Sequence, residues 1–373
     1  KDDFTDGNAK FITYNNVYAN PALQIDVEDR VKIAGGEKQR TLQYGDVVFT
    51  GSSETPDECG ISSVVTVKTE EKLYLNSFCF FFRFDDLSIM LPDFAKHLFR
   101  SNELRYQIGK TASGVTRYNV SKKLMEKVSI PVPPLPVQSE IVRILDNFTE
   151  LTAELTAELT ARKKQYEFYR DCLLIFDDTV PLVKLSDLCE IGDGLHGTPT
   201  YSDDGEYYFI NGNNLSNGKI VVDPKTKKIA KNEYEKIGIS FGETILFSIN
   251  GTIGNIAIYN NEKIALGKSA AYFNVISDRL LMKYLFYILQ SGPMMTYFEK
   301  NLTGSTIKNL GLKSLRDCQI AVPSLNVQKR IVSILNRFDA LCNDLTSGLP
   351  AEIEARTKQY EYYRDKLLTF KEQ

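Results

Sequence analysis

Two basic segments at corresponding places in the chain contain residues suited to binding a polyanion. Residues 96–127 include eight lysines and arginines against two acidic residues, and residues 300–316 include four basic residues and no acidic one. Each segment also contains a Gly-x-Thr sequence, beginning at Gly114 and at Gly304. Glycine lets backbone N–H groups approach phosphate oxygens closely, and lysine or arginine displaces counterions from phosphates. The two segments therefore predict phosphate contacts, although a charged run is more often a solvated face.

The side chains predicted to contact DNA lie on loops in both halves of the chain. Threonine and asparagine can hydrogen-bond to base edges, while lysine and arginine bind the phosphate backbone. The candidates in the first half are Ser52, Ser53, Thr116, Arg117, Asn119, Lys122 and Lys123, and those in the second half are His196, Thr198, Tyr201, Ser248, Asn250, Thr252, Thr306, Lys308, Asn309 and Lys313. Turn formation is the alternative explanation for the serines and asparagines, because these residue types favour tight turns for backbone reasons.

The remaining motifs predict no catalytic, metal or cofactor site. A GxGxxG sequence spans residues 192–197, but the chain continues as loop where a dinucleotide site needs the start of a helix. Residues 267–269 end like a Walker loop, but Glu262 stands where its first glycine is required. Two histidines and six cysteines without a CxxC pair do not supply a plausible zinc site. The sequence also lacks the GxSxG and HExxH motifs.

Composition is that of a soluble globular protein. The 373 residues are 43% hydrophobic and 25% charged, and no apolar run approaches the roughly 20 residues of a membrane span. Scattered cysteines and the absence of a signal peptide favour a cytoplasmic location. Because the formal net charge is -3, a nucleic-acid hypothesis rests on local charge alone.

The chain encodes one module twice. Residues 114–148 align without a gap with residues 304–338 at an offset of 190, and two ARxKQYExYRD sequences further on match at an offset of 194. This duplication predicts two similar domains related by a pseudo-twofold axis. No counterpart of residues 181–201 stands before Lys1, which is not a methionine, so we expect the N-terminus to be incomplete.

A mixed α/β domain is predicted to precede a long helix in each half. Short β-branched and aromatic runs, such as residues 64–67 and 256–259, alternate with glycine and asparagine turns. From residue 138 to residue 176 apolar side chains recur every three or four positions without glycine or proline, which predicts one helix about 60 Å long. The second helix begins near Gln328 and is expected to break at Gly348-Leu349-Pro350. The most economical arrangement pairs the two helices in antiparallel fashion.

Several segments together resemble the specificity subunits of type I restriction-modification enzymes. A tandem TAEL repeat lies at residues 151–161, and the segments IPVPPLPVQSEIVRIL and IAVPSLNVQKRIVSIL form a pair. The two KQYExYRD sequences and GDGLHGTPTY at the start of the second half also match the family pattern. The resemblance covers nearly the whole chain.

The resemblance implies an α+β protein with two target-recognition domains separated by a pair of long antiparallel coiled-coil helices. The expected segments are a first domain at residues 1–132, a first helical spacer at 133–180, a second domain at 181–322 and a second spacer at 323–373. Such a chain is a noncatalytic subunit that reads a bipartite site in double-stranded DNA. Two methyltransferase subunits dock on its helices, and restriction and translocase subunits join through that complex. S-adenosylmethionine, ATP and Mg are then bound by partner subunits, and no cofactor by this chain.

The TAEL repeat suggests that helix length sets the spacing between the two reading domains. Four helical residues add about 6 Å and about 40° of net rotation, whereas one base pair adds about 3.4 Å and roughly 34 to 36°. One further repeat is therefore expected to suit a DNA spacer about one base pair longer. The alternative hypothesis is a coiled-coil assembly scaffold without sequence-specific DNA binding, and the salt dependence and sequence preference of DNA binding distinguish the two.

Overall fold

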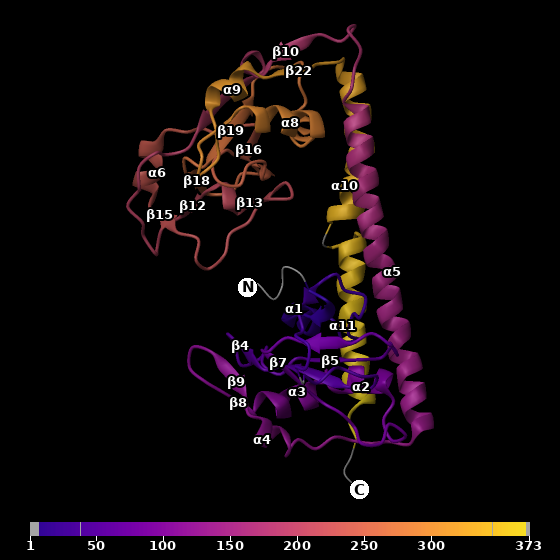
Figure 1. The fold of residues 1–373 in the computed structure, drawn as a ribbon. Helices are drawn as coiled ribbons and strands as arrows, with labels where there is room; N and C mark the ends of the chain where they lie inside the picture. The colour runs from indigo at the N-terminus through magenta and orange to yellow at the C-terminus, as the bar shows by residue number, and fades with distance from the viewer. Residues whose placement is uncertain (1–6, 38, 345, 371–373) are drawn as a thin grey trace. The chain divides into compact units, whose positions relative to one another are not determined.

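The chain folds into two structural units, which we call unit 1 and unit 2. The computed structural model describes residues 7–37, 39–344 and 346–370. Unit 1 consists of Lys1–Leu155 and Ile353–Gln373, and unit 2 consists of Thr156–Glu352. Each unit therefore contains one domain of mixed helices and strands together with parts of the long helices (Figure 1).

The domain of unit 1 contains three small β-sheets and four short helices among its described residues. Its elements are β1 (Ala9–Ile12), α1 (Tyr14–Ala19), β2 (Arg30–Val31), β3 (Val47–Thr50), β4 (Ser52–Ser53), β5 (Ser62–Val64), β6 (Leu73–Leu75), β7 (Cys79–Phe82), α2 (Pro92–Leu98), α3 (Asn102–Gly109), β8 (Ala112–Ser113), β9 (Tyr118–Val120) and α4 (Lys122–Met125). The sheets have the orders β5-β3-β7, β2-β1-β6 and β4-β9-β8. All four residues of β3 are buried, as expected for a central strand of β-branched and aromatic side chains.

The domain of unit 2 repeats this arrangement with additional strands. Its elements are β10 (Leu182–Lys184), η2 (Leu185–Asp187), β11 (Cys189–Asp193), β12 (Tyr207–Ile210), η3 (Gly212–Asn214), β13 (Leu215–Ser216), β14 (Lys219–Ile220), β15 (Lys228–Ile229), α6 (Lys231–Ile237), β16 (Thr244–Ser248), β17 (Ile256–Ile258), β18 (Ile264–Leu266), β19 (Ala270–Val275), α7 (Met282–Leu289), α8 (Gly292–Lys300), β20 (Leu302–Thr303), β21 (Asn309–Leu310), α9 (Leu312–Asp317) and β22 (Gln319–Ala321). The sheet β17-β16-β19 corresponds to β5-β3-β7, and β15-β12-β18 corresponds to β2-β1-β6. In unit 2 the first of these sheets has a fourth strand, β11, on the outer side of β19.

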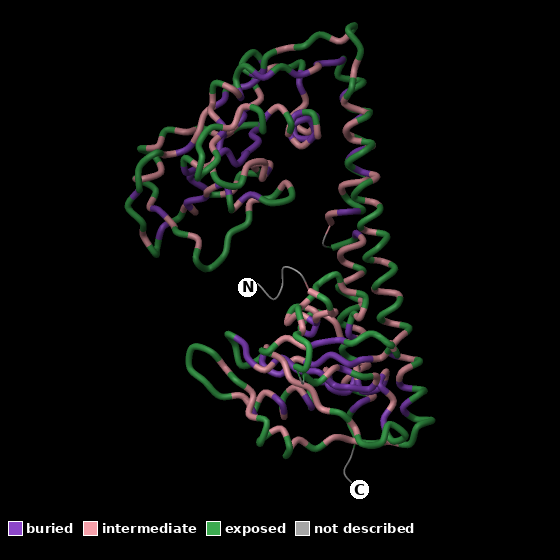
Figure 2. Tube along the Cα trace, in the orientation of Figure 1, coloured by how far each residue is buried: buried purple, intermediate pink, exposed green. Residues whose placement is uncertain are grey.

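Each unit has its own apolar core between the central sheet and the helices. In unit 1, Phe49 of β3 packs with Phe94 and Phe99 in one buried cluster, which also includes Leu145 of the long helix. Figure 2 shows buried residues concentrated on the strands and on the helices next to them, whereas hairpin tips and loops are exposed. The first part of the long helix is therefore part of the domain core, because burial of its apolar stripe stabilises both elements.

The first long helix is continuous and the second is broken. Helix α5 (Leu135–Leu173) has 39 residues, which confirms the prediction of one long helix. The second segment forms α10 (Leu325–Asn343) and α11 (Leu349–Leu367), so the predicted break near Gly348 is also confirmed. A Cβ atom at Gly348 would lie 2.6 Å from the carbonyl oxygen of Ala340, which explains why glycine occupies this position. In the described part of the chain, no helix has both the length and the apolar character of a membrane span.

The long helices contact each other in equivalent ways in the two units. In unit 1 the ring of Phe148 on α5 stacks on Tyr363 of α11 with centroids 5.3 Å apart. In unit 2 the ring of Phe338 on α10 stacks on Tyr169 of α5 with centroids 5.6 Å apart. These pairs occupy equivalent positions, because Phe148 and Phe338 differ by 190 and Tyr169 and Tyr363 by 194. Helix α5 runs from unit 1 into unit 2, whereas α11 runs from unit 2 into unit 1, so the paired helices run in opposite directions, as predicted.

Candidate nucleic-acid interface

A turn and a hairpin come together at the candidate site of unit 2. The turn after β16 carries Asn250, which forms an antiparallel bridge with Asn309 of β21. The amide nitrogen of the Asn250 side chain donates to the side-chain oxygen of Asn309 at 3.3 Å, and the Gly251 backbone N–H donates to the carbonyl of Lys308 at 2.9 Å. Strands β20 and β21 form the hairpin whose tip is residues 304–308. The structure thus brings two separate groups of predicted residues into one surface, on which Thr252, Thr306 and Lys308 are exposed.

Unit 1 contains the same arrangement at the corresponding positions. Strand β4 follows β3 and pairs with β9, with Ser52 opposite Asn119 and Ser53 opposite Tyr118. Strands β8 and β9 form a hairpin whose tip is residues 114–117. The side chains of Thr116, Arg117 and Asn119 are exposed there, as are Lys122 and Lys123 on the following helix. The pair Ser52 and Asn119 therefore corresponds to the pair Asn250 and Asn309 of unit 2.

The glycines of the two Gly-x-Thr sequences have a structural role that differs from the predicted one. A Cβ atom on Gly114 would lie 2.0 Å from the carbonyl oxygen of Arg117, and a Cβ on Gly304 would lie 2.3 Å from that of Ile307. Gly304 also has a φ of +88°, in the region that favours glycine. Each glycine lies close to the backbone on the other side of its hairpin tip, and this contact alone explains why glycine is needed there. The predicted approach of a phosphate to these glycines stays a prediction.

Three predicted serines are buried beneath the candidate surfaces. Ser52 and Ser53 are 5% and 6% exposed, and Ser248 is fully buried. The Ser53 hydroxyl donates to Glu58 at 3.0 Å, and the Ser248 hydroxyl accepts from the backbone N–H of Asn255 at 2.8 Å. The turn interpretation therefore accounts for Ser53 and Ser248, and none of the three hydroxyls lies on the surface described here.

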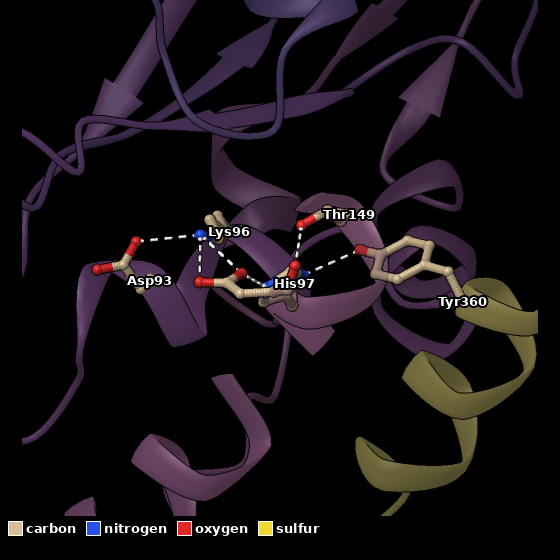
Figure 3. A network of polar contacts seen from close by, with 6 residues as sticks. Asp93, Lys96, His97, Thr149 and Tyr360 are labelled. Carbon is tan, nitrogen blue, oxygen red and sulfur yellow. Dashed lines mark hydrogen bonds and ion pairs between the residues drawn. The ribbon is translucent and has the colours of Figure 1, made fainter. Parts of the chain in front are cut away.

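Three basic residues of the first segment are engaged inside unit 1. Lys96 forms ion pairs with Asp93 and Asp146 (Figure 3). Arg100 donates to the backbone carbonyls of residues 17, 18 and 62, and burial lowers the pKa of Arg100 to about 10. Arg105 donates to the backbone carbonyls of residues 57, 59 and 60. The sequence count of basic residues therefore overstated the cationic surface of unit 1, because these side chains satisfy carbonyls and carboxylates of the fold.

The remaining basic residues are available at the surface. Lys123 and Lys313 are exposed, Arg117 lies over the ring of Phe78 at 5.2 Å, and Lys122 lies over the ring of Phe80 at 5.5 Å. Such cation–π contacts orient a side chain while its charge stays near solvent. The hairpin of unit 1 therefore has more exposed positive charge around it than the hairpin of unit 2.

The predicted residues before β12 belong to another part of unit 2. The Nε2 atom of His196 lies 2.8 Å from a carboxylate oxygen of Asp193. Tyr201 bridges to Ile229 of β15, and its ring packs edge-on against Phe209. Tyr201 therefore contacts the sheet β15-β12-β18, whereas His196 contacts the end of β11. Thr198 lies exposed on the loop between them.

A polar network that the sequence did not reveal supports the turn of unit 2. The Ser269 hydroxyl donates to the side chain of Asn211 at 2.9 Å and accepts from the Gly212 backbone N–H at 2.9 Å. The side-chain amide of Asn255 donates to the Gly212 carbonyl at 3.1 Å. Because the network joins residues from three distant segments, it holds the base of the turn that carries Asn250. No sequence motif marks these residues, since each is a common turn residue by type.

Neither metal ligands nor reactive thiols gather among the residues that the structure describes. Within the described ranges, no group of three or more His, Cys, Asp or Glu side chains is arranged to hold a metal ion. Burial raises the pKa of Cys79, Cys189 and Cys318 to about 12, so these thiols are poor nucleophiles at neutral pH. The exposed Thr, Asn, Lys and Arg side chains of the hairpins are of types that hydrogen-bond bases and neutralise phosphates.

Comparison with known proteins identifies a family model that matches both halves of the chain, and relatives that match about two thirds of it. A family model for the type I restriction modification DNA specificity domain matches residues 3–162 and 178–355. The specificity subunit of the Escherichia coli type I restriction enzyme EcoR124I/EcoR124II is 38% identical over 277 residues, which cover 67% of this chain and 65% of that subunit. The putative type I specificity subunit S.MpnORF615P of Mycoplasma pneumoniae is 32% identical over 252 residues, which cover 64% of this chain and 92% of the relative.

Solved structures show the same fold. A structure from work on complex assembly and conformational transition of the type I R-M system has a TM-score of 0.63 and 17% identity, covering 98% of this chain and 92% of that one. The type I restriction-modification S subunit from M. genitalium has a TM-score of 0.50 and 14% identity, covering 100% of this chain and 92% of that one. Since the family model matches both halves of the chain separately, the chain belongs to the family of type I restriction-modification specificity subunits.

Proposed function

We propose that this chain is the noncatalytic DNA-recognition subunit of a type I restriction-modification complex. Each unit reads one half of a bipartite site in double-stranded DNA, and the helices set the distance between the halves. Two methyltransferase subunits dock on the helical segments, and the restriction and translocase subunits join through them. S-adenosylmethionine, ATP and Mg are bound by those partners, and the complex acts in the cytoplasm.

The observation that carries the proposal is the repeated turn and hairpin. In both units a residue following the central strand bridges to the hairpin strand, as Ser52 does to Asn119 and Asn250 does to Asn309. The hairpin tips at residues 114–117 and 304–308 are exposed in both units. The side chains at the tips differ, with Arg117 in one and Ile307 in the other, although the backbones correspond. A shared scaffold with different exposed side chains is what two readers of different half-sites require.

Alanine substitution of residues in the hairpin of unit 2 tests whether this unit reads a half-site. The triple substitution Thr306→Ala, Lys308→Ala and Asn309→Ala is introduced, and methylated sites are sequenced in a host that expresses the chain with its methyltransferase partner. We expect the sequence preference to relax in one half of the bipartite site and to stay unchanged in the other. The exposed Lys225, on a loop remote in sequence from the hairpin, provides the control substitution Lys225→Ala, which should leave both halves unchanged. Unchanged methylation by the triple variant would exclude the hairpin as a reader.

The spacer proposal rests on the continuity of α5 through the TAEL repeat. Residues 152–159 lie within one uninterrupted helix that begins in unit 1 and ends in unit 2. Removal of Thr152–Leu155 shortens this helix by about 6 Å and rotates its end by about 40°. We expect the DNA spacer in the methylated sites to shorten by about one base pair. An unchanged spacer in this deletion variant would rule out the helix as the measuring element.

The assembly-scaffold hypothesis makes a different prediction for DNA binding. A DNA reader prefers its site over unrelated DNA by orders of magnitude and loses affinity as salt rises from about 50 to 200 mM. A scaffold with solubilising lysines shows weak binding without sequence preference. Fluorescence anisotropy separates the two functions. It compares DNA that contains the site found by methylation sequencing with scrambled DNA, in the presence of the methyltransferase partner.

A further inference from the structure

Among the described residues, the outer edge of the central sheet has no partner strand in unit 1 and is paired in unit 2. Strand β7 ends the order β5-β3-β7, whereas its counterpart β19 lies between β16 and β11. Strand β22 of unit 2 is likewise paired with β10, in the same segment as β11. Among the described residues of unit 1, no strand pairs with residues 129–131, which correspond to β22. Unit 1 therefore presents backbone N–H and C=O groups along an edge that is a template for strand addition.

An apolar groove runs beside this free edge. Its cavity has a volume of about 340 Å³ and is lined mainly by Phe80, Phe82, Phe99, Met125, Val128 and Ile130. All of these except Phe99 are only partly buried. An apolar groove beside an unpaired strand combines the two features that bind an extended peptide, because the edge supplies hydrogen bonds and the groove receives alternate side chains.

The counterparts of the partly buried groove residues are fully covered in unit 2. The residues at the positions of Phe80, Phe82, Met125, Val128 and Ile130 are Ala271, Phe273, Leu315, Cys318 and Ile320, each no more than 3% exposed. They share one buried cluster with Leu185, Leu188, Cys189 and Ile191 of the η2–β11 segment. Helix α9, the counterpart of α4, contacts both η2 and β11. The segment at residues 182–193 is therefore what fills this space in unit 2.

Charges around the groove differ from those of unit 2 in a defined way. The Lys184 ammonium lies 3.1 Å from a carboxylate oxygen of Asp317. The residue at the position of Asp317 in unit 1 is Lys127, which is exposed. A segment placed on β7 in the same way would therefore bring a lysine against a lysine if it kept Lys184. An acidic residue at the position of Lys184 would again place opposite charges next to each other, because it would face Lys127.

We propose that this groove docks an extended polypeptide segment, carried on the N-terminal side of the domain, which pairs antiparallel with β7 as β11 pairs with β19. The segment has large apolar side chains at the positions of Leu185, Leu188 and Ile191. It has an acidic side chain at the position of Lys184. Docking completes a four-stranded sheet in unit 1, and the five partly buried lining residues become buried like their counterparts.

The chain itself supplies the probe for a test. The corresponding strands β1 and β12 differ by 198 in residue number, so residues 181–198 placed directly before Lys1 reproduce the spacing of unit 2. The extension carries Lys184→Glu, and a control extension carries Leu188→Asp and Ile191→Asp in addition. Hydrogen exchange of the amides of residues 79–82, 129 and 130 is measured in both full-length chains. We expect exchange at least about tenfold slower with the first extension than with the control.

Two comparisons decide the outcome. Equal exchange rates in the two extended chains would overturn the docking proposal, and equal protection by extensions with and without Lys184→Glu would overturn the charge assignment. A synthetic peptide of residues 181–194 with Lys184→Glu, added to the unextended chain, avoids any folding defect of the extension. Saturable protection of residues 79–82 supports the proposal, and no protection at about 1 mM peptide argues against it.

Discussion

The two units hold the ends of the long helices with different chemistry at the same positions. In unit 1, His97 lies between Asp146 of α5, at 2.7 Å, and the hydroxyl of Tyr360 on α11, at 2.9 Å (Figure 3). In unit 2, Tyr287 and Asn336 occupy the positions of His97 and Asp146, and the Tyr287 hydroxyl lies 2.6 Å from the side-chain oxygen of Asn336. One contact is therefore ionisable and the other neutral. Both units therefore have a hydrogen bond between a domain helix and a long helix at this position, but the side chains that form it are ionisable in unit 1 and neutral in unit 2.

Another contact is the same in both units. Gln138 and Gln328 are fully buried, and each accepts from the N–H at the start of a domain helix, at Leu91 or at Leu281. Each side-chain amide also donates to two backbone carbonyls. The comparison of identical and divergent contacts predicts which substitutions have equal effects in the two units and which do not.

The largest effects are expected at the identical glutamines. Gln138→Leu and Gln328→Leu each leave one buried N–H and two carbonyls without their partner, so each should lower the free energy of unfolding of its unit by about 3 kcal/mol. Hydrogen exchange of amides in each unit, recorded as the denaturant concentration is raised, measures the free energy of unfolding of both units. Arg143→Ala, which removes an exposed ion pair with Glu140 on the same helix, should change stability by less than about 0.5 kcal/mol. Clearly unequal losses for the two glutamines would contradict their equivalence.

A smaller effect is expected where the turns of the two units differ. Arg105 donates to three carbonyls of the turn at residues 57–60, whereas its counterpart in unit 2, Met295, packs against Gly254 of a shorter turn. Arg105→Met should therefore lower the local stability of the first turn by about 2 kcal/mol. Faster amide exchange at residues 57–60 is the measurement, with the exposed Lys123→Met as control. Unchanged exchange would show that the turn is stable without the guanidinium.

The pH dependence of stability should distinguish the two helix contacts. Burial lowers the pKa of His97, so the folded unit 1 binds its proton less tightly than the unfolded chain does. The contribution of His97 is then complete above the unfolded pKa of about 6.5 and is lost as the pH falls below it. Burial alone would raise the pKa of Asp146, but hydrogen bonds from His97 and Lys96 outweigh it and hold that pKa below its usual value. We expect unit 1 to be less stable at about pH 5 than at about pH 7.

The double substitution His97→Tyr and Asp146→Asn gives unit 1 the side chains of unit 2 at these positions. Thermal unfolding at several pH values should then show a weaker dependence between about pH 7 and pH 5 than the unsubstituted chain. If the two chains lose stability in parallel as the pH falls, another group is responsible.

The smallest expected effect concerns the exposed cations of the hairpins. Each lysine or arginine that contacts a phosphate contributes about 0.9 to the slope of log affinity against log salt concentration. Replacing Arg117, Lys122 and Lys123 with alanine should lower this slope by about 2.7, and replacing Lys308 and Lys313 by about 1.8. Fluorescence anisotropy across a salt series measures the slopes. Equal reductions for the two variants would show that the units do not differ in phosphate contacts as their exposed charges indicate.

Local sequence signals predicted the helical part of the fold. The apolar period without glycine or proline predicted α5, and Gly348-Leu349-Pro350 predicted the break between α10 and α11. The alignment at an offset of 190 predicted two equivalent domains. These features depend on neighbouring residues or on direct repetition, so one sequence was sufficient to find them.

Features that depend on the direction of a side chain could not be predicted in the same way. Arg100 and Arg105 counted as surface charge in the sequence, but both point into unit 1 and bind carbonyls. Ser248 lies on a predicted turn and is buried by the fold. Strands of two residues, such as β4 and β20, have no periodicity to detect, and β4 also pairs with β9, which lies far along the sequence.

Each unit contains the end of a long helix that is encoded in the other half of the chain, and this has a consequence for how the gene can recombine. Unit 1 takes residues 353–367 from the second half of the chain, and unit 2 takes residues 156–173 from the first. The helix ends that are exchanged carry nearly the same ARxKQYExYRD sequence, so each domain meets an almost identical surface whichever half supplies it. Recombination between genes within the repeated blocks can therefore replace one domain with a foreign one while the surfaces that hold it are retained. If each unit reads one half-site as proposed, such an event would change one half-site and leave the other unchanged.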